Sequence, residues 1–127
     1  KHGWIDFNAG VLVQGATMEE TSEAFFKELL AIAKAFVEAY HGRSAFLQEE
    51  SAREIARRVE KFPWTGLGVF PQGEDVIMSQ GWGENGQCML KMNVRTGAAA
   101  VVMTNRNPEV DQAVSGVEWL TDLLMQR

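Results

Sequence analysis

Three short apolar segments separated by glycine-containing turns, all within residues 76–105, constrain the fold of this chain more than any other feature. Residues 76–79 are apolar and rich in β-branched side chains, and residues 88–94 alternate apolar with polar side chains, the pattern of a half-buried strand. Residues 98–103 form a continuous run of small apolar residues, which is typical of a strand covered on both faces. We therefore predict an antiparallel meander of three strands.

The connections between these strands are predicted from their glycines. The GWGENG segment, residues 81–86, supplies the first turn, and Arg95-Thr96-Gly97 supplies a tight second turn. Glycine favours both positions because it adopts a positive φ without a steric cost. Upstream, residues 66–70 are predicted to begin the sheet, and residues 71–75 are predicted to form a hairpin loop.

The N-terminal third predicts a short strand and a long helix. Residues 11–13, within a possible strand region at 5–13, are all apolar. Thr17-Met18-Glu19-Glu20 is a capping box, in which a hydroxyl and a carboxylate satisfy the free amides of a helix start. The helix is expected to end near Gly42. Its apolar side chains recur at helical spacing and are expected to enter the core: Phe25, Phe26, Leu29, Ile32, Ala33, Phe36, Val37 and Tyr40.

Two further helices are expected. Residues 49–60 carry apolar side chains on one side and predict a short surface helix, which Phe62-Pro63-Trp64 ends because proline disfavours helix in the preceding residue. Asn107-Pro108-Glu109 predicts the capped start of the last helix. That helix has an apolar stripe: Val110, Ala113, Val114, Val117, Leu120 and Leu124.

These elements predict an α+β fold in one domain, residues 1–127. An antiparallel sheet of four or five strands would have a long N-terminal helix and a C-terminal helix packed on it. No internal repeat or low-complexity linker divides the chain, and a hydrophobic content of 46% is enough to build a core.

Composition excludes several classes of function. A net charge of −5 argues against a nucleic-acid surface, which needs clustered cations. Arg53, Arg57, Arg58 and Lys61 do form a basic stripe, but glutamates interleave with it, and we interpret it as a solvated helix face. Cys88 is the only cysteine, so an internal disulfide is excluded, and we expect it to be a buried strand residue. The sequence has no stretch of about 18 apolar residues, so no membrane anchor is predicted.

Apart from any family resemblance, the sequence gives only weak signals for a group of catalytic residues. His41 lies beside Gly42 at a predicted helix end, where an imidazolium interacts favourably with the helix dipole. The acidic pairs Glu19-Glu20, Glu49-Glu50 and Glu74-Asp75 are assigned to a cap, a helix start and a loop, so no pair emerges as acid and base. Neither a metal site nor a cofactor site is predicted.

Three motifs nevertheless point to a family. Ser79-Gln80-Gly81-Trp82-Gly83 is followed by the turn and strand at residues 84–90, and Val101-Val102-Met103-Thr104-Asn105 closes the run. This order resembles the C-terminal part of the serine β-lactamase family, which includes class C β-lactamases, D-alanyl-D-alanine peptidases and esterases. That family carries a Lys-Thr-Gly or His-x-Gly box, a turn rich in glycine and asparagine, and a stretch ending in Met-Thr-Asn. The resemblance is strong over residues 66–105 and looser from Thr17.

The chain also departs from the family pattern. The family nucleophile is a serine followed three residues later by a lysine that activates it. The serines of this chain are followed at that position by Phe, Leu, Glu, Trp and Glu: Ser22, Ser44, Ser51, Ser79 and Ser115. The Tyr-x-Asn box is missing as well, because the only tyrosine, Tyr40, begins Tyr-His-Gly. We therefore predict no catalytic residue.

The third box is altered, because Ser79-Gln80-Gly81 offers only neutral hydrogen bonds, roughly half as strong as charge-assisted ones. Arg95-Thr96-Gly97 looks like Lys-Thr-Gly, but its position between two strands favours the turn. The resemblance implies a substrate-binding set: Ser79, Gln80, Gly81, Trp82 and Asn85. Packing and ligand contact are equally consistent with Trp82, and Asn85 could form the turn or bind a ligand. The other tryptophans, Trp4, Trp64 and Trp119, are expected in the core or at docking surfaces.

Two hypotheses of function follow. In the first, the chain is the C-terminal portion of a β-lactamase-like serine hydrolase that acts on a peptide, ester or lactam, with serine and lysine supplied by an N-terminal portion. In the second, it is a non-catalytic module that binds a ligand or associates with itself on a truncated hydrolase scaffold. The partners expected are a small molecule or peptide, and either a second copy or the N-terminal portion.

Overall fold

The computed structural model describes residues 4–6, 11–13, 18–84, 86–104 and 110–126; for residues up to 26 and for Gln112 it describes the backbone alone. Its elements, in chain order, are β1 (Trp4–Asp6), β2 (Val11–Val13), α1 (Met18–Tyr40), α2 (Glu49–Ala56), β3 (Phe70–Gln72), β4 (Val76–Gly83), β5 (Gly86–Asn93), β6 (Ala99–Met103), the 3-10 turn η1 (Gln112–Val114) and α3 (Gly116–Met125). β1 pairs with β2, and the other strands form one antiparallel sheet in the order β3-β4-β5-β6. The α+β class and the four-stranded antiparallel sheet are confirmed.

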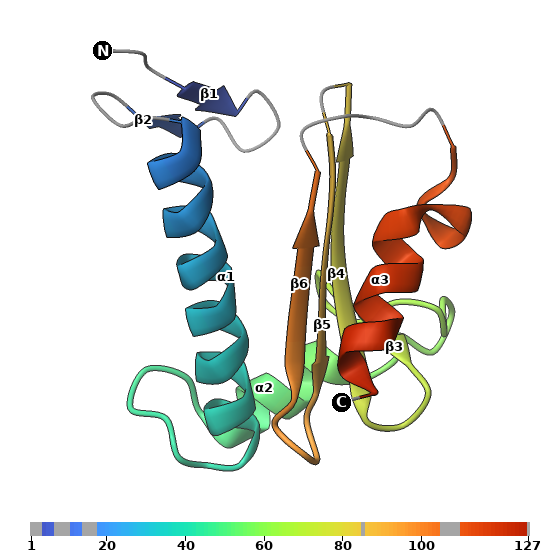
Figure 1. Ribbon diagram of the computed structural model, residues 1–127. Coiled ribbons are helices and arrows are strands. Elements are labelled where there is room, and N and C mark those ends of the chain that lie inside the picture. Colours follow the sequence, from blue (N-terminus) through green and yellow to red (C-terminus); the bar gives the residue numbers. More distant parts are fainter. Residues whose placement is uncertain (1–3, 7–10, 14–17, 85, 105–109, 127) are drawn as a thin grey trace.

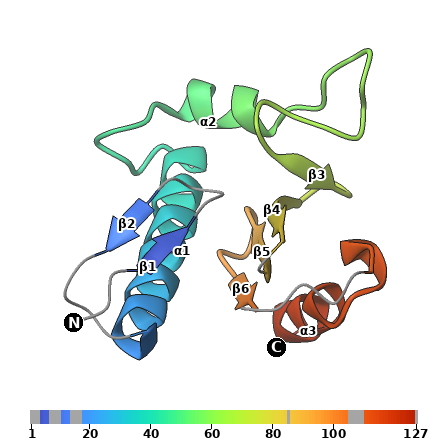
Figure 2. The same ribbon diagram turned by 90° about the horizontal axis from the view of Figure 1, so that it is seen from above.

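The molecule has three layers, with α1 on one face of the sheet and α3 on the other (Figures 1 and 2). Alternate side chains of β4, β5 and β6 enter two apolar clusters, one on each face of the sheet. Ala33 and Val37 of α1 pack with a set of strand residues that includes Ile77, Leu90 and Val101. Across the sheet, Val117 of α3 packs with Met78, Met89 and Val102. Burying one side chain of this size stabilises the fold by roughly 1.5–3 kcal/mol, so both helices are held mainly by these contacts.

The long helix α1 begins and ends within the predicted span, but its apolar stripe is narrower than predicted. Ala33 and Val37 are buried, and Leu29, Phe36 and Tyr40 pack beside them. Ile32 was expected in the core, yet 58% of it is exposed. Because successive residues of a helix are turned by about 100°, Ile32 lies well round the helix from Ala33 and faces solvent. The Thr17 cap and the side chains of Phe25 and Phe26 lie outside the described residues.

The helix predicted over residues 49–60 ends early, at Ala56, because Arg57 is extended (ψ 135°). The chain then turns back, and the N–H of Leu67 donates to the carbonyl of Ile55 at 3.0 Å. This long-range bond satisfies a carbonyl at the helix end that a further helical turn would otherwise have used.

The edge strand of the sheet also differs from the prediction, because β3 covers Phe70–Gln72 and not residues 66–70. Gly66 instead closes a turn, in which its N–H donates to the carbonyl of Val69 at 2.8 Å. Pro71 lies inside β3 because an edge strand tolerates a residue without an N–H.

The hairpin of β4 and β5 is longer than predicted. Pairing continues to Gly83 opposite Gly86, so Gly81 and Trp82 lie in β4 and the prediction of a loop from residue 81 was wrong. A continuous register with β5 outweighs the weak strand preference of these glycines. The turn at Arg95-Thr96-Gly97 is confirmed: Gly97 has φ +81°, and its N–H donates to the carbonyl of Asn93 at 2.9 Å.

The C-terminal helix begins later than the apolar pattern predicts. Ser115 is extended (φ −83°, ψ 160°) and precedes α3, so η1 and α3 are separate elements. Val117 is buried, whereas Val110 and Val114 are 42% and 78% exposed and do not belong to a common core stripe. Leu120 and Leu124 are also exposed, at 38% and 40%. The predicted cap at residues 107–109 lies outside the described residues.

Candidate functional site

The residues predicted to bind substrate lie on β4 and divide between its two faces. Ile77 belongs to the cluster under α1 and Met78 to the cluster under α3, and strand side chains alternate from there. Ser79 and Gly81 therefore face the side of α1, whereas Gln80 and Trp82 face the side of α3. One ligand cannot contact the side chains of Ser79, Gln80 and Trp82 together. Asn85, the fifth residue of the set, lies outside the described residues.

The upper half of β4 has a strand neighbour on one side. β3 pairs with β4 only as far as Phe70 opposite Met78, whereas β5 continues along β4 to its end. Residues 79–83 therefore pair with β5 and do not have β3 beside them. A strand in that position can hold an extended peptide through main-chain hydrogen bonds.

Gly81 has a packing role that accounts for its lack of a side chain. A Cβ atom built on Gly81 would lie 3.0 Å from Sγ of Cys88, its partner across the hairpin. Cys88 lies in a strand, β5, as predicted, but its thiol is half-buried and not buried. Ser79 lies one alternation away on the same face, and its hydroxyl can donate or accept a hydrogen bond.

On the opposite face, Trp82 is 53% exposed and pairs with the buried Gln87. Nε2 of Gln87 donates to the carbonyl of Val110 at 3.0 Å, and its backbone N–H donates to Oγ1 of Thr104 at 3.1 Å. Oε1 of Gln87 has no hydrogen-bond partner among the described residues. The sequence did not mark Gln87 as a buried polar residue. Thr104, from the Met-Thr-Asn motif, has a structural role, because it bonds to the backbone of Gln87.

Trp64 and Trp119 were expected in the core or at docking surfaces, and they are 63% and 68% exposed. Trp64 stacks on Phe70, with ring centroids 6.1 Å apart and an interplanar angle of 14°. Neither residue belongs to the core. The side chain of Trp4 lies outside the described residues.

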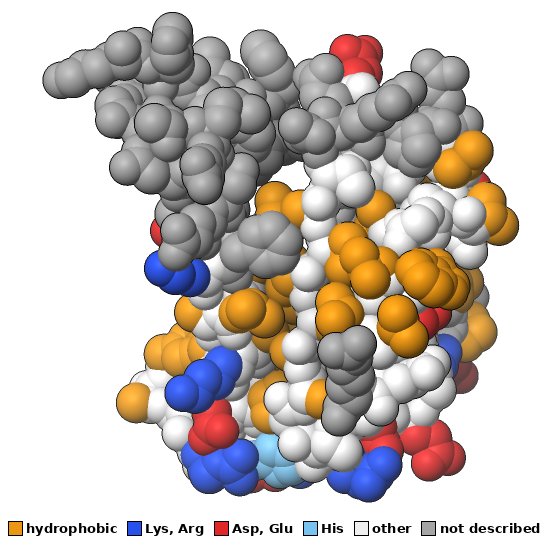
Figure 3. Space-filling view, in the orientation of Figure 1, with side chains coloured by type: hydrophobic (Ala, Val, Ile, Leu, Met, Phe, Trp, Pro, Cys, Tyr) orange, Lys and Arg blue, Asp and Glu red, His pale blue; other side chains and the backbone are white. Residues whose placement is uncertain are grey.

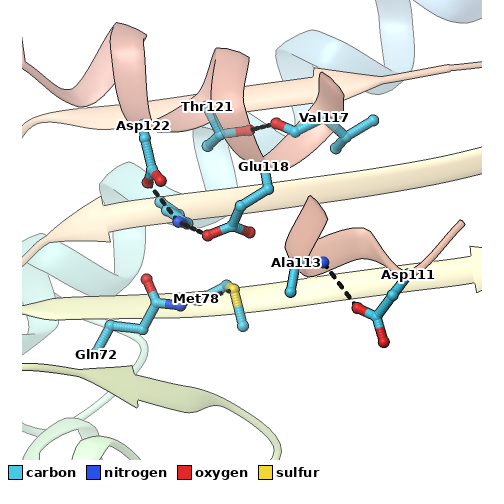
Figure 4. A network of polar contacts seen from close by, with 9 residues as sticks. Gln72, Met78, Asp111, Ala113, Val117, Glu118, Thr121 and Asp122 are labelled. Atoms are coloured by element: carbon cyan, nitrogen blue, oxygen red, sulfur yellow. Dashed lines mark hydrogen bonds and ion pairs between the residues drawn. The ribbon is translucent and has the colours of Figure 1, made fainter. Parts of the chain in front are cut away.

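An ion-pair network centred on a buried lysine joins the sheet to α3 (Figure 4). Nζ of Lys91, on β5, lies 2.5 Å from Oε1 of Glu118 and 2.5 Å from Oδ1 of Asp122, and its side chain is only 3% exposed. Burial lowers the pKa of Lys91, but hydrogen bonds to Asp122 and Glu118 outweigh it and raise the pKa above its ordinary 10.5. Because both carboxylates compensate the ammonium, the network serves to dock α3.

A hollow of about 420 Å³ lies where the end of α1 and α2 meet the turn between β3 and β4. Its lining residues include three arginines, Arg53, Arg57 and Arg58. The basic stripe predicted from the sequence is therefore not a single helix face, because Arg57 and Arg58 follow the end of α2. His41, which follows the lining residue Tyr40, is not itself a lining residue of the hollow; its Nε2 donates to the carbonyl of Val94 at 2.5 Å.

Among the residues that the structure describes, no group of three or more His, Cys, Asp or Glu side chains is arranged to hold a metal ion. None of the helices described is both long and apolar enough to cross a membrane. Comparison with family models, with curated proteins and with solved structures finds no match to the chain.

Proposed function

We propose that this chain is the C-terminal portion of a β-lactamase-like serine hydrolase. The order of its motifs along β4, β5 and β6, followed by the final helix, supports the proposal. The observation that carries it is the position of the altered box: Ser79 and Gly81 share one face of β4, in the section of the strand that β3 does not reach. A substrate could lie there in extended form beside the strand.

In this proposal the intact enzyme transfers an acyl group to a serine, which water then deacylates. The serine and its lysine base lie in another portion, because no serine of this chain has a lysine three residues later. β4 contributes main-chain hydrogen bonds and the hydroxyl of Ser79. Since a hydroxyl forms neutral hydrogen bonds, we expect weaker binding of a substrate carboxylate than a lysine would give. Gln80 and Trp82 face the other way and are left out of the substrate contacts.

Covalent labelling of the purified chain tests whether it carries a nucleophile. The folded chain is incubated with a fluorescent penicillin or a fluorophosphonate ester, and its intact mass is then measured. We expect no more adduct than forms on the urea-unfolded chain. An adduct that forms only on the folded chain, mapped to one of its serines and abolished by substitution of that serine by alanine, would refute the proposal.

A second function, self-association, is favoured by the outward face of α3. Four apolar side chains on this helix are 37–68% exposed: Trp119, Leu120, Leu123 and Leu124. Figure 3 shows hydrophobic side chains gathered over this helix. Apolar surface of this kind is commonly covered by another chain, and we propose a second copy.

Light scattering tests self-association. We expect the molar mass of a dimer for the wild-type chain and of a monomer for Leu123→Glu. Leu67→Glu, which places the same charge at an exposed leucine in the loop after α2, is the matched control and should remain dimeric. A monomeric wild-type chain at all concentrations would refute the second function and leave the hydrolase proposal untouched.

A further inference from the structure

The hollow beside α2 combines cations with an apolar wall. Arg53, Arg57 and Arg58 line it, together with Tyr40 and Glu74. Apolar residues of the lining include Val76, Ile77 and Val94. From this combination we propose that the hollow binds a small molecule that joins an oxyanion, either phosphate or carboxylate, to a compact apolar group. The site does not depend on the hydrolase proposal, because it lies at the other end of β4 from residues 79–83.

Arg58 carries most of the argument. Its Nη1 donates to the carbonyl of Pro63 at 2.5 Å and its Nη2 to the carbonyl of Gly73 at 2.9 Å. Carbonyl oxygens orient the guanidinium without neutralising it, and no carboxylate of the described residues lies within ion-pair distance of it. A guanidinium has five N–H donors, so two bonds to carbonyls leave it able to bind an oxyanion.

The neighbouring arginines are positioned by carboxylates on α2. Nε of Arg53 lies 2.8 Å from Oε1 of Glu49, and the same guanidinium lies 4.4 Å above the centre of the Tyr40 ring. Nη2 of Arg57 lies 2.5 Å from Oε1 of Glu54. Each of these contacts uses one edge of a planar group that can bind a second oxyanion along another edge.

The size and lining of the hollow set the rest of the ligand. A volume of about 420 Å³ is within the range of small-molecule sites, and the apolar side chains favour a ring or short chain attached to the anion. Among the described residues that line the hollow, Glu74 is the one carboxylate. It repels an anion, so its removal should strengthen binding, whereas loss of any of the three arginines should weaken it.

The test is an NMR titration of the ¹⁵N-labelled chain with phenyl phosphate, benzoate and, as a neutral ligand of similar shape, benzyl alcohol. We expect saturable shifts at the amides of Arg57, Arg58 and Gly73 with at least one of the two anions, and weaker binding at higher salt. Comparison of phenyl phosphate with benzoate distinguishes phosphate from carboxylate ligands. No saturable shift with either anion, or equal binding of benzyl alcohol, would overturn the proposal.

Variants make the test specific. Arg58→Gln should lower affinity by about tenfold, the loss of one charge-assisted contact. Because Arg58 also holds two carbonyls, Arg57→Gln is the second variant and should weaken binding in the same direction while leaving those bonds in place. Glu74→Gln should strengthen binding by about two- to fivefold. Arg43→Gln, at an arginine outside the hollow, is the control and should bind as the wild type does. Unchanged affinity in all of the first three variants would overturn the proposal.

Discussion

The network around Lys91 predicts an unusual order of stabilities among its variants. Lys91 is 3% exposed, whereas the side chains of Glu118 and Asp122 are 20% and 51% exposed. The double variant E118Q/D122N therefore leaves a buried ammonium without an anion, which costs about 3–5 kcal/mol. K91M leaves two carboxylates that water reaches in part, and its methionine fills the space of the lysine, so it should cost only about 1–2 kcal/mol.

Equilibrium unfolding in urea measures these differences, since the free energy of unfolding is extrapolated linearly from the transition. The triple variant K91M/E118Q/D122N is the decisive member of the series. It replaces the ammonium of Lys91, which E118Q/D122N leaves buried without an anion, by an apolar side chain. We therefore expect the triple variant to be about 1–2 kcal/mol more stable than E118Q/D122N. Equal slopes of unfolding across the series would show that the variants alter stability and not the extent of folding.

Two results would refute this reasoning. K91M could prove as destabilising as E118Q/D122N, or the triple variant could prove no more stable than the double. Either result would mean that Lys91 is not a buried cation that depends on the carboxylates of α3.

Three further predictions concern stability. Because the pKa of Lys91 is raised in the folded state, the stabilisation that its ammonium gives is present below pH 10.5 and is lost as the pH rises through the raised pKa. The difference in unfolding free energy between wild type and K91M should therefore shrink above pH 10.5. A difference that does not change there would contradict this. Gly81→Ala should destabilise the wild type by about 0.5–1 kcal/mol, because the Cβ of the new alanine meets Sγ of Cys88. In a C88A background, where that sulfur is absent, the same substitution should stabilise by a similar amount. Equal effects in the two backgrounds, measured by urea unfolding, would exclude this contact. Gly97→Ala should cost about 1 kcal/mol because φ there is +81°. Gly116→Ala, in the first turn of α3, should stabilise by up to about 1 kcal/mol, because an added Cβ would meet no atom within 4 Å outside the local backbone; thermal unfolding that ranks the two variants in the opposite order would contradict this.

Local patterns predicted the elements whose signals are contained in a few neighbouring residues. The span of α1 follows from its apolar repeat and from Gly42, which has φ +70° at the helix end. The turn at Gly97 follows from the positive φ that glycine permits. The end of α2 was missed because it depends on the bond from Leu67 to Ile55, a contact that no local pattern encodes.

The candidate sites were less predictable because they depend on tertiary contacts. The alternation of β5 marked Lys91 as a polar position, but its burial requires Glu118 and Asp122 from a distant helix. Their spacing of four residues on α3 was the available signal. The residues at 79–82 were treated as one site because the family resemblance grouped them as the third box and its flank, whereas a strand places alternate side chains on opposite faces.

The most direct test of the hydrolase proposal is to map the nucleophile in the protein as its own cells produce it. A biotinylated penicillin or fluorophosphonate is added to the cell extract, and the captured proteins are digested and analysed by mass spectrometry. The proposal predicts that peptides of this chain are enriched and that the adduct lies on a serine followed three residues later by lysine, outside these 127 residues. No enrichment with either probe, or an adduct on a serine of this chain, would contradict it.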